Sequence, residues 1–324
     1  MVLVPSYGEE DKEFDSKQPY VIIRMNLSKR NFVQTAIQAI LNFLKVLIFM
    51  KPHRILITDY GAQKCASLAT FIFPFPIPYY ITVHGSEILW HFKHKNKLKQ
   101  KILALIVARF FMKARAIFCV SKFTRKKLLK VMPQLCNKTY VVHPGIDLER
   151  LPTPNKEEIL KLKTSLKISG PVLLTVARLI PEKGIDMVLH ALSQLVSEFP
   201  ELKYIVIGTG PDFNRLQRIV RNLCLNHHTI FVGKVHDKEL SKYYALSDIF
   251  VMASRSHFDY SGRIEGFGLV FAEANAFGKP VIAGKTGGVP EVVIHGYNGI
   301  LVDPYDAGEI QKAIQKMLLN PEIR

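Results

Sequence analysis

The chain has 324 residues, of which 48% are hydrophobic and 22% are charged. That length is sufficient for two ordinary domains, and the hydrophobic fraction is typical of a globular rather than a disordered protein. The 44 Lys and Arg outnumber the 27 Asp and Glu, which gives a formal net charge of +17. This imbalance excludes a low-charge structural repeat and indicates an anionic partner: phosphate, nucleic acid or an acidic membrane surface.

We expect neither a signal peptide nor a membrane-spanning segment. Acidic residues crowd positions 9–15, and the basic region that opens a signal peptide is missing. No run reaches the roughly 18 uncharged apolar residues that a transmembrane helix needs. The four cysteines lack metal-ligand spacing and are too few for a disulfide framework, so buried thiols in a reducing compartment are expected.

Short β-rich runs alternate with amphipathic stretches from one end of the chain to the other. In the first half, the predicted strands cover residues 20–24, 54–58, 79–83, 116–120 and 139–142. Residues 32–50 are predicted to form an amphipathic core helix, because apolar side chains recur there at helical spacing.

After a polar stretch that contains Pro152 and Pro154, the same alternation resumes. Predicted strands here cover residues 171–176, 203–208, 229–232, 248–252, 280–283 and 299–302. Strands separated by helices are typical of parallel sheets with crossover helices, so the fold class is α/β. We place the domains at residues 1–150 and 151–324, and expect the ligand beyond the carboxyl ends of the strands, in a cleft between the domains.

Residues 254–291 carry the most chemical information. A predicted strand is followed by a loop rich in Ser and Gly, and a helix then starts near Gly268 and ends at Gly278. The backbone amides at that helix start lack helical partners, which makes them an anion site that a phosphate can approach closely. Glu265 and Glu273 flank this site, and their carboxylates suit hydroxyl groups on either side of a phosphate, as in a sugar and a ribose.

Cations follow another predicted strand, residues 171–176. Arg178 and Lys183 leave its carboxyl end on the same rim as Glu265, and together they can neutralise a diphosphate. His84 follows the predicted strand at residues 79–83, where an ordinary sheet order turns it towards the cleft.

In this order and spacing, the residues resemble the retaining glycosyltransferases of family 4, whose two facing Rossmann-like domains form the GT-B fold. The resemblance is strong over residues 171–310 and looser over residues 50–150, and residues 140–147 resemble the hinge segment of that family. The motifs that carry it are Arg178, Lys183, the Glu265 and Glu273 pair with its seven-residue spacer, Gly287 with Gly288, and His84 with Gly85.

The resemblance implies a nucleotide-sugar donor held mainly by the second domain, with no other cofactor. GDP-mannose and a UDP-sugar both fit the motif. As catalytic residues, Glu265 is implied to contact the transferred sugar, and His84 to touch the sugar or its phosphate. The residues implied to bind the donor are Arg178 and Lys183 at the diphosphate, Gly266, Phe267, Gly268 and Leu269 in the loop, Glu273 at the ribose, and Lys234 and Val235 at the base.

Retention in that family is attributed to front-face attack, in which the leaving phosphate accepts the proton of the acceptor and no protein nucleophile is required. Cations on the phosphates suit this chemistry, because they stabilise the leaving group. No Asp-x-Asp stretch is present, so no metal site is expected.

Each candidate residue also has a plainer interpretation. A single Lys or Arg after a strand is usually a solvated charge, and Glu265 alone could cap a helix. A histidine at a strand end, such as His84, is often only a structural hydrogen-bonding residue. The order and spacing of the whole set favour a donor site over these separate interpretations.

The sequence departs from the family pattern at both ends. An acidic segment follows residues 1–5 where the family has a Gly-rich loop, and the chain stops at Arg324 before the usual terminal helix. We therefore expect that the chain lacks the first N-terminal unit and the C-terminal tail.

The positive charge is concentrated in the first half. Residues 1–150 hold 24 Lys and Arg against 9 Asp and Glu, a net charge of +15, while residues 151–324 carry +2. Residues 91–130 include 13 Lys and Arg and no acid. A solvated helix surface, a nucleic-acid site and docking to anionic lipid are the three interpretations. Docking is favoured, since Trp90, Phe92, Phe110 and Phe111 accompany the cations without forming a stacking platform for bases.

Together these observations predict a retaining, metal-independent hexosyltransferase of cell-envelope glycan or polysaccharide synthesis, acting on a lipid-linked or glycan acceptor. It is expected to be cytoplasmic and peripheral at the inner face of the membrane, with no nucleic-acid partner. The alternatives are a non-catalytic protein that binds nucleotide sugar or nucleic acid, and a sugar-nucleotide epimerase of the GT-B fold.

Overall fold

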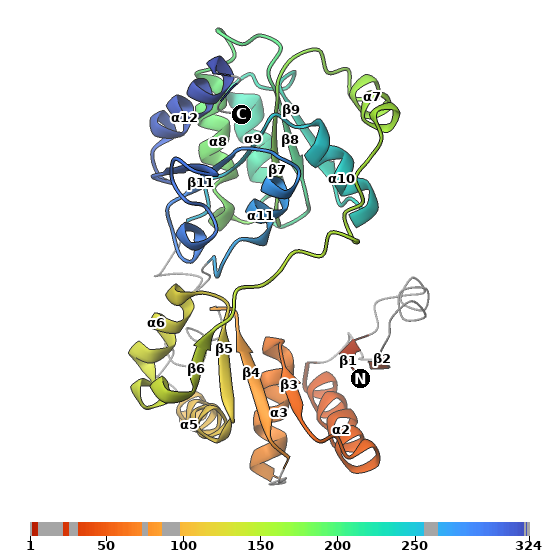
Figure 1. The fold of residues 1–324 in the computed structure, drawn as a ribbon, viewed down its shortest axis with the longest axis vertical. Coiled ribbons are helices and arrows are strands. Elements are labelled where there is room, and N and C mark those ends of the chain that lie inside the picture. Colours follow the sequence, from red (N-terminus) through yellow and green to blue (C-terminus); the bar gives the residue numbers. More distant parts are fainter. Residues whose placement is uncertain are drawn as a thin grey trace. The chain divides into compact units, whose positions relative to one another are not determined.

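The computed structural model describes residues 2–5, 22–25, 32–72, 77–85, 98–255, 265–320 and 322. The chain divides into two compact units, which Figure 1 shows in the colours of the sequence. Unit 1 comprises Met1–Val83, Trp90–Phe118 and Leu129–Tyr140, and unit 2 comprises His84–Leu89, Cys119–Leu128 and Val141–Arg324.

The main sheet of unit 1 has four strands in the order β3-β4-β5-β6. Its strands are β3 (Ile55–Ile57), β4 (Tyr79–Val83), β5 (Ala116–Cys119) and β6 (Thr139–Val141), the last two of which end in unit 2. A separate pair, β1 (Val2–Pro5) and β2 (Ile22–Met25), is parallel. β1 is a strand that the sequence analysis did not predict.

Three helices of unit 1 pack in a row: α2 (Phe32–Met50), α3 (Tyr60–Ile72) and α5 (Leu98–Lys113). Tyr79 of β4 stacks on Phe110 of α5 with ring centroids 4.8 Å apart, and its hydroxyl donates to the Phe110 carbonyl at 2.7 Å. Burial raises the pKa of Tyr79 far above its usual value. The predicted helix at residues 32–50 is confirmed as α2, with Leu47 buried on its inner face.

Unit 2 contains a six-stranded parallel sheet in the order β12-β11-β10-β7-β8-β9. Its strands are β7 (Val172–Val176), β8 (Lys203–Ile207), β9 (Thr229–Gly233), β10 (Ile249–Met252), β11 (Val281–Gly284) and β12 (Gly299–Val302). The helices are α6 (Lys122–Val131), which ends in unit 1, α7 (Lys156–Ser165), α8 (Ile185–Ser193), α9 (Phe213–Asn222), α10 (Asp237–Leu246), α11 (Leu269–Ala276) and α12 (Ala307–Leu319). The predicted α/β class is confirmed.

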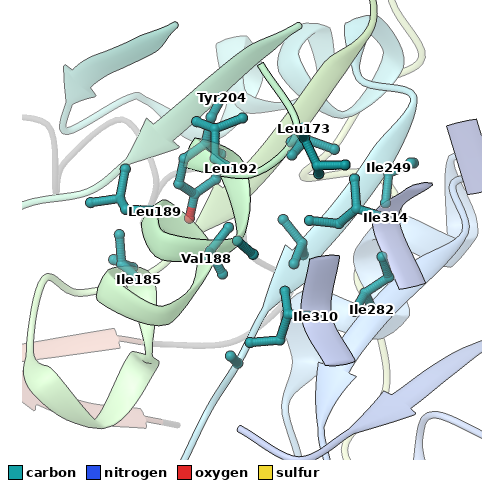
Figure 2. Close-up of a cluster of buried hydrophobic side chains, with 14 of the residues drawn as sticks. Leu173, Ile185, Val188, Leu189, Leu192, Tyr204, Ile249, Ile282, Ile310 and Ile314 are labelled. Atoms are coloured by element: carbon teal, nitrogen blue, oxygen red, sulfur yellow. The ribbon is translucent and has the colours of Figure 1, made fainter. Parts of the chain in front are cut away.

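Apolar cores cover both faces of this sheet. On one face, side chains from β7, β8, β10 and β11 meet those of α8 and α12; Figure 2 shows Leu173, Leu189, Ile249, Ile282 and Ile314 converging there. The other face carries a second cluster that includes residues of α10 and α11. With both faces buried, the strands are near-continuous apolar runs, which is why their positions could be predicted.

The strand order reverses between β7 and β10. After β7 the chain continues to β8 and β9 on one side, while β10 returns to pair with the other edge of β7. Such a switch point leaves room at the carboxyl ends of the two strands, where α/β proteins bind ligands.

The cysteines were predicted to be buried, but Cys136 and Cys224 are exposed, because both lie in short segments at the surface. Among the helices described, none combines the length and the apolar character that crossing a membrane requires.

Candidate functional site

The turn after β7 touches the segment after β10 at the switch point. A 3-10 helix, Pro181–Lys183, ends at Gly184, whose φ of 66° is left-handed. A Cβ atom on Gly184 would lie 1.9 Å from the carbonyl oxygen of Ala253. This close approach requires glycine, and it positions Lys183 beside the chain that leaves β10.

Lys183 and Glu265 form an ion pair at this point. Lys183 Nζ donates to Glu265 Oε2 at 2.6 Å, and Ser254 Oγ donates to the same oxygen at 3.3 Å. The two charged side chains are 22% and 15% exposed. From the sequence, Lys183 is expected to bind a diphosphate and Glu265 a sugar. The structure brings the two side chains into contact, and both roles remain predictions.

A buried cation that the sequence analysis missed supports this turn. Arg255 donates from Nη2 to both carboxylate oxygens of Asp186, at 3.0 and 2.8 Å, and from Nε to the carbonyl of Pro181 at 3.0 Å. Arg215 donates to Asp186 at 3.1 Å and to Asp212 through two bonds. Burial opposes ionisation of Asp186, but the two guanidinium groups outweigh it and lower the pKa of this carboxyl.

Glu273 is buried, with 6% of its surface exposed, near the middle of α11. Tyr244 of α10 donates its hydroxyl to Glu273 Oε2 at 2.8 Å, and Arg150 Nη2 donates to Oε1 at 3.1 Å. Arg150 also pairs with Asp237, with Nε and Oδ2 3.4 Å apart. Burial and the neighbouring carboxylate raise the pKa of Tyr244 well above its usual value. The carboxylate of Glu273 is therefore buried and fixed by hydrogen bonds, and it is not a solvated charge on a helix surface.

Glycines allow several loops of unit 2 to meet around Gly266. A Cβ atom on Gly266 would lie 2.1 Å from the carbonyl oxygen of His84, and one on Gly288 would lie 2.0 Å from that of Gly266. The amide of Gly288 donates to the Glu265 carbonyl at 2.9 Å. The segment between Glu265 and the helix start is therefore fixed through its backbone.

The predicted helix near Gly268 is confirmed as α11. Gly268 precedes it with a φ of 93°, and Gly278 follows it with a φ of 67°. Phe267 is buried and stacks on His143, with ring centroids 5.1 Å apart.

Glu291 caps α6, a role that the sequence analysis did not assign. Its two carboxylate oxygens accept the amides of Lys122 at 2.7 Å and Phe123 at 2.9 Å, and His143 Nε2 lies 3.1 Å from Oε2. Burial opposes ionisation, but these hydrogen bonds lower the pKa of Glu291. The same carboxylate thus joins α6 to the segment that carries His143.

The remaining predicted site residues lie at the surface of their elements. Arg178, His84, Lys234 and Leu269 are exposed, and Val235 packs partly against the second core. Two aromatic residues of the predicted docking region, Phe110 and Phe111, are buried in unit 1, so the prediction that they face a lipid interface is wrong. Other members of that region lie outside the described residues: Trp90, Phe92, Lys93, Lys95 and Lys97. Within the ranges described, no group of three His, Cys, Asp or Glu side chains could hold a metal ion.

Parallel α/β units with a polar rim at the switch point define the class of Rossmann-like proteins. Comparison with known families narrows this class to one family. The family model for glycosyl transferases group 1 matches residues 157–324, and that for glycosyltransferase family 4 matches residues 1–150. The chain belongs to this family of glycosyltransferases.

Curated relatives and solved structures agree with this placement. The GDP-mannose-dependent alpha-(1-6)-phosphatidylinositol monomannoside mannosyltransferase of Mycolicibacterium smegmatis is 30% identical over 241 residues, 74% of this chain and 60% of that protein. The D-inositol 3-phosphate glycosyltransferase 2 of Catenulispora acidiphila is 34% identical over 190 residues, 56% of this chain and 42% of that protein. The chain thus spans about 60% of the length of the first of these relatives.

The structural likeness extends over the whole chain. Anabaena Alr3699/HepE in complex with UDP-glucose has a TM-score of 0.79 at 22% identity, covering 99% of this chain and 83% of that one. WaaG, a glycosyltransferase involved in lipopolysaccharide biosynthesis, has a TM-score of 0.72 at 16% identity, covering 100% and 92%. The predicted GT-B fold is confirmed.

Proposed function

We propose that the chain is a retaining glycosyltransferase that moves a sugar from GDP-mannose or a UDP-sugar to a lipid-linked or polysaccharide acceptor in cell-envelope glycan synthesis. The observation that carries this proposal is the Lys183 and Glu265 pair at the switch point of unit 2, with the buried Glu273 on the helix that follows. Family membership and the mannosyltransferase names of several relatives support it.

The pair leaves hydrogen-bonding capacity for a sugar diphosphate. An ammonium group has three donors, so Lys183 can keep Glu265 and still donate to a phosphate oxygen. Glu265 keeps Oε1 for a hydroxyl of the transferred sugar, and Glu273 has lone pairs left for a ribose diol. In this proposal Arg178 shares the diphosphate, the backbone near Lys234 and Val235 meets the base, and His84 touches the sugar or its phosphate.

Charge stabilisation of the leaving group is the main chemical contribution of these residues. Fixed cations at the phosphates stabilise negative charge as the glycosidic bond breaks, without rearrangement at the moment of reaction. The acceptor oxygen bonds to the anomeric carbon on the face from which the phosphate departs, and the leaving phosphate accepts the proton of that hydroxyl. Because the new bond forms on the same face as the one that breaks, the anomeric configuration is retained. We propose no metal ion and no protein nucleophile for this step.

We further propose that the protein acts at the cytoplasmic face of a membrane, as a peripheral protein. The exposed face of α5 supports this: Ile102, Leu105 and Met112 alternate there with Lys101, Arg109 and Lys113, and the helix has no acidic residue. Apolar side chains among snorkelling cations are typical of helices that lie on anionic lipid.

Two substitutions test the donor site. Lys183→Met is expected to lower the rate of sugar transfer roughly 100-fold or more, because it removes one charge at the leaving group. Lys242→Met is the matched control, since Lys242 is 21% exposed, like Lys183, and pairs with Glu158 and Glu239, neither of which is proposed to bind the donor. Donor identity is read from a thermal-shift screen with UDP, GDP and their sugars, because a ligand bound by the native state raises its stability. Wild-type turnover in Lys183→Met would contradict the proposal.

A further inference from the structure

A cavity of about 250 Å³ lies between two helices of unit 1 and belongs to no part of the donor site. Ser67, Thr70 and Phe71 line it from α3, and Ile106, Arg109, Phe110 and Lys113 line it from α5. The cavity therefore combines two cations, two hydroxyls and an apolar wall.

The cations are its hydrogen-bond donors. Ser67 Oγ donates to the carbonyl of Lys64 at 2.8 Å, and Thr70 Oγ1 donates to that of Ser67 at 3.0 Å. Both hydroxyl hydrogens are thus used within α3. Arg109 and Lys113 are four positions apart, which places them on the same face of α5, and both are exposed. Since the described residues that line the cavity include no carboxylate, a charged occupant must be an anion.

Exposed apolar side chains lie on both helices that form the cavity. Phe71 is 62% exposed on α3, and Leu105 is 70% exposed on α5. Ile102 and Met112 continue the exposed apolar face of α5 along the helix. An anionic group in the cavity would therefore be bordered by side chains that favour an apolar environment, which describes the headgroup of a lipid better than a solvated polyanion.

From this arrangement we propose that the cavity between α3 and α5 binds the phosphate of an anionic lipid headgroup, with Arg109 and Lys113 as its ligands and Phe71 and Leu105 against the acyl boundary. The inference rests on the proposed peripheral membrane location and names the binding site within it. A planar guanidinium and a compact ammonium can each contact a different oxygen of one phosphate.

The test is vesicle flotation of the full chain with phosphatidylcholine vesicles that do or do not contain phosphatidylglycerol. Arg109→Gln with Lys113→Gln is expected to weaken binding to the anionic vesicles roughly tenfold or more, since each cation near a charged surface contributes separately. Lys312→Gln with Lys316→Gln is the matched control, because these exposed lysines have the same spacing on α12 of unit 2. The control pair is expected to bind like the wild type.

A second pair of variants tests the exposed apolar side chains of α5. Leu105→Ser is expected to weaken vesicle binding, whereas Leu160→Ser, which changes a 63% exposed leucine on α7, is expected to leave it unchanged. Circular dichroism and thermal unfolding establish that all variants are folded.

Several results would overturn the proposal. Equal vesicle binding by the wild type and the Arg109 and Lys113 double variant would remove the cavity as the headgroup site. So would a double variant that loses affinity for inorganic phosphate or for an oligonucleotide but not for vesicles, since the cavity would then serve a soluble anion. A wild type that ignores anionic vesicles would overturn both this inference and the membrane location. Nucleotide-sugar binding, followed by thermal shift, separates that outcome from failure of the donor site.

Discussion

At the scale of single residues, two glycines of unit 2 share a backbone conformation but not an environment. Gly184 has a φ of 66° and Gly278 a φ of 67°. The Cα of Gly184 faces the carbonyl oxygen of Ala253, whereas nothing lies within 4 Å of a Cβ atom on Gly278. The pair therefore separates the conformational requirement for glycine from the steric one.

Gly184→Ala and Gly278→Ala test that distinction. Both should lose about 1 kcal/mol of unfolding free energy for a left-handed residue that carries a Cβ. Only Gly184→Ala also forces backbone apart, so its total loss should reach about 3 kcal/mol or more. Chemical denaturation measures both values. If the two variants were equally stable, the close approach of the turn to the segment after β10 would be refuted.

Tyr244→Phe tests how Glu273 is held. The substitution keeps the ring against Phe250 and Phe277 but removes the donor to a buried carboxylate. We expect a loss of about 1–2 kcal/mol in unfolding free energy and weaker nucleotide-sugar binding in calorimetry. Tyr243→Phe removes the neighbouring hydroxyl, for which the described part of the structure gives no hydrogen bond, and should change neither quantity. Unchanged stability and affinity in Tyr244→Phe would argue against a role for this hydroxyl.

At the scale of elements, Glu291 links the start of α6 to His143. A carboxylate at a helix start satisfies amides that have no partner within the helix, and it is favoured there by the helix dipole. Because the pKa of Glu291 is lower in the folded protein than in the unfolded chain, its stabilising effect depends on pH.

The direction of that dependence follows from the lowered pKa. The contribution of Glu291 is complete above its ordinary pKa of about 4.3 and is lost as the pH falls through the folded-state value. Glu291→Gln should therefore be less stable than the wild type by about 1–2 kcal/mol near neutral pH. The difference should shrink between about pH 5 and pH 3. Urea denaturation across this range measures it, and a difference that grows on acidification would exclude the cap as its source.

The sequence predicts the secondary-structure elements better than it predicts the contacts of the candidate site. Strands β4 and β12 were predicted at their observed bounds, because runs of apolar and β-branched residues between turns carry a local signal. The contacts of the site are not local. Arg255 and its partner Asp186 lie 69 positions apart, and Tyr244 and Glu273 lie 29 apart, so no spacing rule joins them. Motif order indicated Lys183 and Glu265, but only the fold shows that they touch each other.

At the scale of the whole molecule, the positive charge and the donor site belong to different parts of the chain. The excess of +15 lies in residues 1–150, while the residues proposed to hold the donor phosphates lie in a part with a net charge of +2. In the proposed function, the bulk of the positive charge faces the anionic membrane surface, and only a few cations bind the donor phosphates.

Salt should separate these two functions. Raising the ionic strength from about 0.1 M to 1 M shortens the screening length from roughly 10 Å to 3 Å. The affinity for anionic vesicles depends on many exposed cations, so it should fall steeply over this range. The affinity for a nucleotide sugar should fall much less. Flotation and calorimetry at matched salt concentrations measure the two slopes. Parallel slopes would show that the basic surface and the donor site act on the same ligand.

The strand order of unit 2 also bears on how the chain folds during synthesis. Of the strands in the six-stranded sheet, β7 is synthesised first, and β8, which pairs with one of its edges, follows soon afterwards. The partner of its other edge, β10, is synthesised about 70 residues later. At roughly 5–20 residues per second, the ribosome leaves that edge unpaired for several seconds. An apolar strand with an unpaired edge can form backbone hydrogen bonds with strands of other chains, which leads to aggregation. The strand order that creates a switch point in the finished protein therefore also leaves a central strand with one unpaired edge during synthesis.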